Sequence, residues 1–470
     1  LRPQGRATVR GNPGRGGGNG LMVSTLRPKA GPPRSYRFPE FQDQKLPNGI
    51  RLVTAPVAKL PVATVLVIVD AGSANDPPGK EGVAALTAGA LLEGGAELDG
   101  AAVAERFEQL GTSVESGADW DSAFVKITTL TDRLEEAVTL LGETISSAEF
   151  PEREVERLRA ERLAEILQLE TEPRGLADEK FAEFLYPSDS RYSKPDEGST
   201  ESVSALSRGD VTEFYRSRYR TGATTVVVAG DISTDRARDL IARTFERWPK
   251  GAPARPHVSA TPRSSRRTLH IVNKIDAPQS ELRVGHIGLQ RKHPDFFPTV
   301  VMNAVLGGLF GSRINLNLRE EHGYTYGASS YFDWRRSPGP FVVSTAVQSE
   351  VTGPALREIL HEIDRIRRER ISDGELSLAR DYLSGVFPIR YETTAAIASA
   401  LASLVVYELP ADYYDSYRSN INAVSIENVL TAARTHLHPG ELQTTVVGDA
   451  RVIRQAVGEL ELGDVQVHGG

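Results

Sequence analysis

The sequence has no cysteine, which excludes disulfide bonds, thiolate metal sites and cysteine nucleophiles together. It also lacks any run of about 18 apolar residues, the length that a membrane-spanning helix requires. The longest apolar stretches have the length of a strand, as in "TVLVIVD" (Thr64 to Asp70). Neither sign of charge dominates, because 55 basic and 62 acidic residues give a net charge of -7. We therefore expect no nucleic-acid partner and no membrane span.

The first 36 residues contain no acidic residue and no apolar core of the kind found in signal peptides. Their Gly, Arg and Pro content predicts a flexible basic tail over residues 1–36. The chain begins with Leu1, and Met22 is one of only two methionines, so residues 1–21 are left open as part of the natural protein. The missing signal peptide favours a cytoplasmic location, and a periplasmic one stays open if the N-terminus was processed or truncated.

Three segments of the first half resemble segments that follow roughly 210 to 220 residues later, a period typical of two related domains rather than of a solenoid. Gly111 faces Gly323 in one of these pairs, and Trp120 lies near Trp334. The pairs are "TTVVVAGDISTDRARDLIARTF" (224–245) with "QTTVVGDARVIRQAVGEL" (443–460), the stretch 107–127 with 319–344, and "ALLEGG" (90–95) with "AVLGGLFG" (304–311). The chain is therefore predicted to be a duplicated unit.

A stretch rich in Pro, Ser and Arg, 249–267, separates the two copies and is interpreted as a linker. We predict domains over 37–248 and 268–470. Strand patterns in each copy are mixed with long helices such as 151–170, whose Glu and Arg spacing suits a solvated face. Because the strands and helices do not alternate regularly, the fold class is predicted to be α+β.

The segment "EGVAALTAGALLEGG" (81–95) reads as a helix entered from a Pro-Pro-Gly turn, yet it contains almost no side chain capable of chemistry. A core helix of an unrelated protein would explain its small residues. That alternative does not explain the motifs on either side of it.

Those motifs resemble the pitrilysin or insulinase family of zinc peptidases, and most closely its bacterial members related to mitochondrial processing peptidase. The resemblance runs from about Tyr36 to the end of the chain and rests on these stretches: "GIRLV" (49–53), "AGSANDPPGKEGVA" (71–84), "VVVAGDIS" (226–233) and "AVLGGLFGSRINLNLREEHGYTYGASS" (304–330). It implies two homologous domains, each a mainly antiparallel sheet packed with helices.

In catalytic members, the helix after Pro-Pro-Gly carries His-x-x-Glu-His, and a further Glu roughly eighty residues on completes the zinc site. Here Ala85, Ala88 and Gly89 stand at those three positions, and none of the nine histidines precedes His257. No zinc ligand set is therefore expected in the first half. Glu165 falls close to the place of the third ligand and is interpreted as a relic or a solvated helix residue, with its role left open.

In the second half, "LREEHGYTYG" (318–327) predicts a helix end with Gly323 as the C' residue and then a strand with Tyr324 and Tyr326 on one face. Arg319 and Tyr326 match an Arg and Tyr pair that, by the resemblance, holds substrate opposite the zinc. A guanidinium can anchor a substrate carbonyl or carboxylate, and a phenol can stabilise an oxyanion. The alternative is that Arg319 pairs with a nearby Glu and Tyr326 is a core residue.

Other candidate sites are weaker. His436 and His438 in "HLHPGEL" (436–442) are expected to share a strand face, but no third metal ligand is evident beside them, so no metal is predicted there. The glycines of "LGGLFGSR" (306–313) lack the Lys-Ser/Thr of a phosphate-binding loop. A Gly-x-Ser-x-Gly nucleophile elbow is also absent.

These observations predict a non-catalytic subunit of a heterodimeric zinc metallopeptidase, inactive alone and active only with a homologous catalytic subunit. The chain itself is expected to bind no cofactor, with zinc held by the partner. It would form half of a chamber for short or unfolded peptides. Two alternatives stay open: a structural core protein of a membrane respiratory complex, and a stand-alone peptide-binding homodimer.

Overall fold

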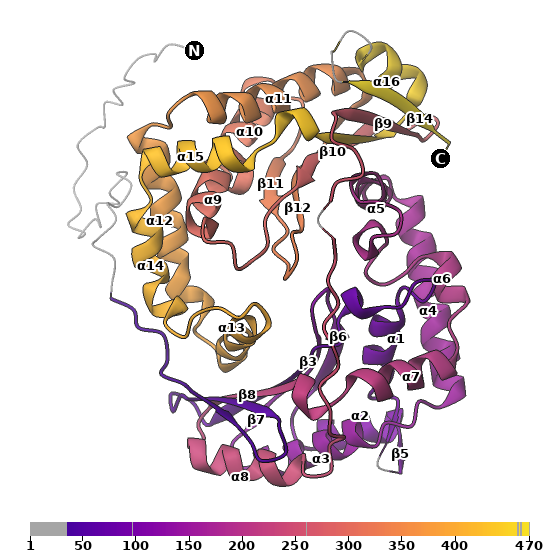
Figure 1. Cartoon of the computed structure of the whole chain (residues 1–470), viewed down its shortest axis with the longest axis vertical. Helices are drawn as coiled ribbons and strands as arrows, with labels where there is room; N and C mark the ends of the chain where they lie inside the picture. The colour runs from indigo at the N-terminus through magenta and orange to yellow at the C-terminus, as the bar shows by residue number, and fades with distance from the viewer. Residues whose placement is uncertain (1–34, 96, 260, 458–459, 461–462, 470) are drawn as a thin grey trace, which may run out of the picture. The chain divides into compact units, whose positions relative to one another are not determined.

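The computed structural model describes residues 35–95, 97–259, 261–457, 460 and 463–469. Nearly all of the predicted tail, 1–36, lies outside these described residues. Two six-stranded sheets organise the rest (Figure 1), one built from strands between Gln42 and Gly230 and the other from strands between Thr268 and His468. Most neighbouring strands are antiparallel and helices pack on the sheets, so the predicted α+β class is confirmed.

The two sheets repeat one strand order. The first runs β1 (Gln42–Lys45), β2 (Arg51–Pro56), β8 (Thr224–Gly230), β3 (Val62–Val69), β7 (Ala123–Leu130), β6 (Val114–Ala118). The second, read in the matching direction, runs β14 (Asp464–His468), β9 (Thr268–Asn273), β13 (Gln443–Gly448), β10 (Gln279–Ile287), β12 (Pro340–Gln348), β11 (Ala328–Phe332). The parallel pair β2 and β8 corresponds to the parallel pair β9 and β13, and the strands that follow β8 and β13 in this order are antiparallel in both sheets. The sheets differ at the opposite edge, where β1 is antiparallel to β2 but β14 is parallel to β9. The shared strand order supports the predicted duplication.

Local details repeat as well. Gly111 has φ +68° and Gly323 has φ +66°, so both predicted partners take the left-handed conformation in which glycine ends a helix without strain. Trp120 and Trp334 follow the equivalent strands β6 and β11.

The helices of the first half are α1 (Val83–Ala90), α2 (Gly100–Gln109), α3 (Leu134–Ser146), α4 (Glu152–Thr171), α5 (Pro173–Leu185), α6 (Thr200–Ser204), α7 (Arg208–Arg218) and α8 (Thr234–Thr244). Those of the second half are α9 (Phe296–Asn303), α10 (Arg313–Asn315), α11 (Thr352–Arg368), α12 (Asp373–Arg390), α13 (Thr394–Val406), α14 (Tyr413–Ala423), α15 (Ile426–His436) and α16 (Ala450–Val457). The expected helix over 151–170 is thus α4, and its solvated face carries the ion pairs of Arg157 with Glu154 and Glu161.

Each sheet is covered on one face by a helix from the other half. Helix α13 of the second half packs on β3 and β8 of the first sheet, and α5 of the first half packs on β10 and β13 of the second (Figure 1). At the second sheet, Ala177 and Phe184 of α5 contact Val272 and Val447. Strands covered on both faces are buried at nearly every position, which explains why β3, β8 and β13 read as continuous runs of buried residues rather than alternating ones.

The two tryptophan loops meet each other across the halves. The Arg335 guanidinium lies 4.1 Å from the centre of the Trp120 ring, and the Arg336 N–H donates to the Asp121 carboxylate over 2.9 Å. The Arg336 side chain in turn pairs with Asp70 at 2.9 Å. Loops that correspond by duplication therefore form a direct polar contact between the two copies.

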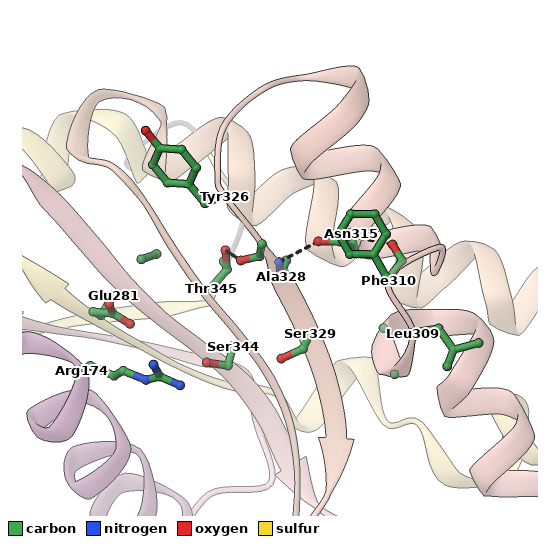
Figure 2. Close-up of a pocket in the computed structure, with 14 residues that line it drawn as sticks. Arg174, Glu281, Leu309, Phe310, Asn315, Tyr326, Ala328, Ser329, Ser344 and Thr345 are labelled. Carbon is green, nitrogen blue, oxygen red and sulfur yellow. Dashed lines mark hydrogen bonds between the residues drawn. The ribbon is translucent and has the colours of Figure 1, made fainter. Parts of the chain in front are cut away.

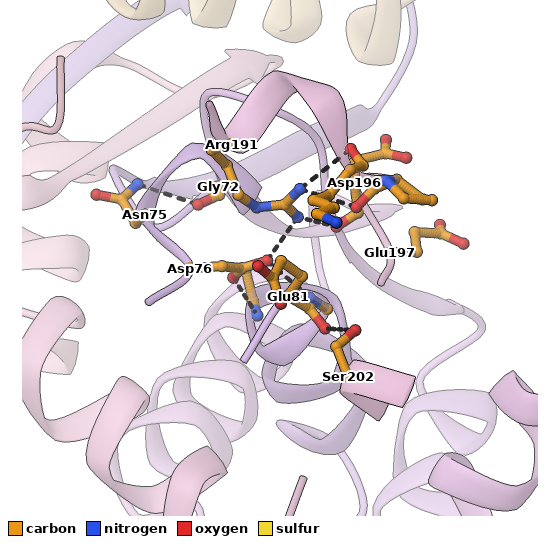
Figure 3. Close-up of polar contacts among 12 residues, drawn as sticks. Gly72, Asn75, Asp76, Glu81, Arg191, Asp196, Glu197 and Ser202 are labelled. Carbon is orange, nitrogen blue, oxygen red and sulfur yellow. Dashed lines mark hydrogen bonds and ion pairs between the residues drawn. The ribbon is translucent and has the colours of Figure 1, made fainter. Parts of the chain in front are cut away.

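Helix α1 has an entry held by a buried carboxylate (Figure 3). Asp76 accepts hydrogen bonds from the Gly82 and Ala84 N–H groups at 2.8 and 2.9 Å and pairs with Arg191 at 2.8 Å. Gly82 has φ +95°, and a Cβ there would lie 2.6 Å from the Glu197 carbonyl oxygen, so only glycine fits. The helix is shorter than the expected 81–95 at both ends. The residues before Val83 form the entry turn, and after Ala90 the chain turns into the short strand β4 (Gly94–Gly95).

One helical stretch among the described residues, Phe296–Glu321, is long and apolar enough to cross a membrane by length and composition alone. Of its most apolar window, 56% is buried within the fold, as in the core helix of a soluble protein. A second candidate would join α12 and α13, which are bent by 115° at their junction.

We predict that Asp76→Ala lowers the free energy of unfolding by about 3 to 5 kcal/mol, because it leaves the buried Arg191 charge unpaired and two helix N–H groups without an acceptor. Urea denaturation of the full chain measures this. Asp43→Ala, which breaks the exposed Asp43–Arg51 pair, is the matched control and should cost less than about 1 kcal/mol. Equal losses in the two variants would contradict the assigned role of Asp76.

A second prediction concerns pH and Asp121. Burial raises the pKa of Asp121 to about 6. The hydrogen bond from the Arg336 N–H and the charge of the Arg336 guanidinium lower this pKa, but their effect is smaller than that of burial. Its unfolded pKa is about 3.9, so ionisation is disfavoured in the folded state, and the stability that Asp121 contributes falls as pH rises from about 4 to about 6. Asp121→Asn removes this titration. The free energy of unfolding of the variant, minus that of the wild type, should therefore increase by on the order of 2 kcal/mol between pH 4 and pH 7.

Urea denaturation at several pH values tests this second prediction, with Asp132→Asn at an exposed carboxylate as control. A difference for Asp121→Asn that stays constant with pH would refute it.

Candidate functional site

The face of α1 where a zinc motif would stand is available but chemically bare. Ala85 and Gly89 lie one helical turn apart and are half-buried, whereas Ala88 is fully buried. A Cβ added at Gly89 would meet only the Leu158 side chain of α4, at 4.0 Å. The positions thus have the geometry of a ligand pair without any donor atom.

Glu165 on α4 does not face a partner acid or imidazole. Its side chain is 65% exposed and pairs with Arg162 at 3.1 Å, and Arg162 also reaches the Glu197 carboxylate at 2.5 Å. Among the described residues of the first half, no three His, Asp or Glu donors converge as metal ligands would. The arrangement fits a solvated helix residue better than a ligand.

The two halves share a cavity near this region. It has a volume of about 490 Å³ and is bounded by α4, α5, β12 and the edge strand β11. Arg162 and Trp120 line it from the first half, and Tyr331 and Arg335 line it from the second. This cavity therefore reaches from α4 and α5 of the first half to the edge strand β11 of the second.

Arg319 lies on a π-helix, η5 (Leu316–Glu321), a rare element that often marks functional sites. The helix ends at His322, and Gly323 is the C' residue, as predicted. The predicted strand over Tyr324 and Tyr326 is wrong, because pairing of β11 with β12 begins only at Ala328.

The loop that replaces this strand is held by side-chain hydrogen bonds from β12. The Thr345 hydroxyl lies 3.0 Å from both the Thr325 hydroxyl and the Gly327 carbonyl oxygen, and the Gly327 N–H donates to the Thr325 hydroxyl over 3.1 Å. The residues on either side of Tyr326 are thus fixed to the sheet. The turn fixes the backbone and leaves the Tyr326 ring outside the fold.

Tyr326 is 94% exposed, so it is not a core tyrosine. It lines a cavity of about 500 Å³ together with Phe310, which is itself 71% exposed (Figure 2). Arg174, Glu281 and Ser344 line the same cavity and add charged and polar groups to its wall. An exposed phenol and an exposed phenyl ring therefore border one polar hollow.

Arg319 does not itself line this cavity, but it packs against Phe310, which does. Its guanidinium lies 4.5 Å from the centre of the Phe310 ring, and its Nε lies 3.6 Å from a Glu320 carboxylate oxygen. Its Nη1 is buried and has no hydrogen-bond partner in the described part of the chain. The pairing with a neighbouring Glu is thus present but long, and one donor is left over. Sequence reasoning missed Phe310, because the exposure of its ring depends on the fold and not on a local pattern.

The C-terminal histidines differ from expectation. The shared strand face of His436 and His438 is wrong, since His436 ends α15 and His438 precedes a short 3-10 turn. The His438 N–H donates to His286 Nε2 over 3.2 Å, while His436 turns toward α9. There it lies close to His293 and Asp295, two possible ligands that are too distant along the sequence for a local pattern to connect them to His436.

Relatives match most of the length of the chain at low identity. An uncharacterized zinc protease of Streptomyces coelicolor is 22% identical over 83% of this chain and 85% of its own. The non-peptidase homolog YmxG of Helicobacter pylori is 23% identical over 83% and 90%. The crystal structure of a peptidase M16 inactive domain from Pseudomonas fluorescens superposes with a TM-score of 0.82 at 25% identity, covering 87% of this chain and 98% of that one.

Two family models match the chain in order. The model of the insulinase family, peptidase family M16, matches residues 52–189, and the model of the peptidase M16 inactive domain matches residues 205–383. Together they match more than half of the chain. The protein therefore belongs to the insulinase family of peptidases, M16, as a peptidase-like member with no histidine before His257.

Proposed function

We propose that this chain is the non-catalytic subunit of a heterodimeric zinc metallopeptidase and presents Arg319 and Tyr326 to a peptide held at the zinc of its partner. The observation that carries the proposal is Tyr326, which is 94% exposed on a loop pinned to β12 beside a polar cavity. A phenol in that position contributes little to the packing of this chain. It is suited to meet a group that another molecule brings.

The chemistry of the pair follows from its donors. The phenol can donate a hydrogen bond to the oxyanion that forms when water attacks a peptide carbonyl. The guanidinium, on a side chain that is 35% exposed, can hold a substrate carbonyl or carboxylate. Both groups then act by positioning and by electrostatic stabilisation, while the attacking water belongs to the zinc of the partner.

The substrate class is a short or unfolded peptide. An extended chain binds a sheet edge through main-chain hydrogen bonds, which leaves side-chain preference loose. The cavity between α4, α5 and β11 and the cavity lined by Tyr326 both lie along the second sheet and would form part of the chamber wall. The partner is a homologous subunit with an intact His-x-x-Glu-His motif.

We predict hydrolysis of a quenched fluorogenic peptide, in the presence of zinc, only when this chain is mixed with such a homologous subunit from the same genome. Arg319→Ala and Tyr326→Phe should each lower kcat/KM of the mixture by about 100-fold, the typical effect of removing one oxyanion or substrate donor. Static light scattering should show a one-to-one complex for the wild type and for both variants, because neither residue is needed for folding.

Two matched variants control for surface changes. Tyr382→Phe alters a half-exposed tyrosine of α12, and Arg368→Ala alters an exposed arginine of α11, and both should leave the activity of the mixture unchanged. Activity of this chain alone would overturn the proposal. A complex with no activity would favour the structural core-protein role, and peptide binding by this chain alone would favour the homodimer.

A further inference from the structure

The ends of helices α9 and α15 bring two imidazoles and a carboxylate together in the second half. His436 is the last residue of α15 and is buried, whereas His293 and Asp295 precede α9 and are half-buried. One donor atom from each of the three residues lies within 4.8 Å of the other two. This is the only such group of three or more His, Asp or Glu donors in the described part of the chain.

We infer that His293, Asp295 and His436 form a binding site for one divalent transition-metal ion of the zinc type. Two imidazoles and one carboxylate are a donor set that such ions prefer, and three protein ligands leave a fourth position for water. The half-exposure of His293 and Asp295 gives an ion access from solvent. The site is separate from α1, so it does not depend on the proposed peptidase role.

Asp295 has the orientation of a ligand rather than of a helix cap. It occupies the N-cap position of α9, where an aspartate usually accepts a hydrogen bond from the first turn, but its side chain makes no such bond. The carboxylate instead turns to His436, whose Nε2 lies 2.8 Å from Asp295 Oδ2. The helix thus forgoes a cap, and the carboxylate is directed at the imidazole of α15.

The residues that carry the donors are fixed in place. Pro294 between His293 and Asp295 restricts the backbone of this short segment, and the Asp295 N–H donates to His293 Nδ1 over 3.1 Å. On the other side, the chain after His436 is tied to β10 by the hydrogen bond from His438 to His286. Helices α9 and α15 also pack against each other. Little ordering is therefore needed when an ion binds.

The distances and charges fit an ion with a small adjustment. Donors around tetrahedral zinc lie about 3.4 Å apart, so the widest donor pair, at no more than 4.8 Å, must close by at most about 1.4 Å, which side-chain rotation allows. For an ion to bind here, the His436 ring must carry its proton on Nδ1, so that the Nε2 lone pair and the Asp295 carboxylate both face the ion. A cation also suits the C-terminal end of α15, where the helix dipole is negative.

The test uses the full-length, untagged chain, stripped with a chelator and titrated with Zn²⁺ by isothermal titration calorimetry. We expect one equivalent to bind and to raise Tm, with affinity at least about tenfold weaker in His436→Ala, His293→Gln and Asp295→Asn. His257→Ala, at an exposed histidine outside the cluster, is the matched control and should bind as the wild type does.

Asp295→Asn preserves side-chain size at a half-exposed position, so it reports on the site even if His436→Ala fails to fold. Co²⁺ provides a second readout, since its visible absorption changes when nitrogen and oxygen donors bind it in a tetrahedral site. No binding by the wild type would overturn the inference. So would binding that the three cluster variants and the His257 control weaken equally.

Discussion

The fold depends on an exchange of helices between its two copies. Each sheet has one face covered by helices of its own half and the other covered by a helix from the opposite half, α13 over the first sheet and α5 over the second. Either half alone would therefore expose a face of strands that are otherwise buried along their length. The exchange also buries charge, since Arg283 of β10 is 1% exposed and pairs with Asp178 of α5. Such a buried guanidinium is tolerated only because its partners are in place, so the two copies are bound to each other by polar as well as apolar contacts.

This exchange determines where the candidate sites lie. Helix α5 follows α4 directly and packs on the second sheet. The end of α4 therefore lies near the edge strand β11, and residues of both line one cavity. The Trp120 and Trp334 loops also meet between the copies, where the Arg335 guanidinium packs on Trp120 and the Arg336 N–H donates to Asp121. A cavity shared by Arg162 and Tyr331 is the result. Residues of both copies thus line one cavity, although Ala85, Ala88, Gly89 and Tyr326 are not among them.

The sequence predicted the features that are local or repeated, and it failed where the cause is distant along the chain. The duplication follows from segments that repeat along the chain. The glycine at the end of η5 and the solvated face of α4 follow from residues close together in sequence. The local pattern predicts a strand at Tyr326, since Tyr324 and Tyr326 alternate as strand residues do. The segment is a loop because the Thr345 hydroxyl, from the next strand, holds it. Likewise, Asp295 and His436 are 141 residues apart, so a pattern around His436 alone shows one ligand and no site. The domain boundaries at 248 and 268 stay a prediction.

Fold and chemistry are separable in α1, and this explains how the helix persists without a motif. The entry is set by Asp76, Gly82 and Arg191, none of which is a zinc-motif position. Ala88 is fully buried and must be small, but Ala85 and Gly89 face a space that packing does not fill, so ligands can be absent there without opening a hole in the core. The opposite holds for Phe310 and Tyr326, whose rings are large and mostly exposed. Their burial contributes little to the stability of this chain beyond the contact of Phe310 with the Arg319 guanidinium, so most of each ring stays available for contact with another molecule.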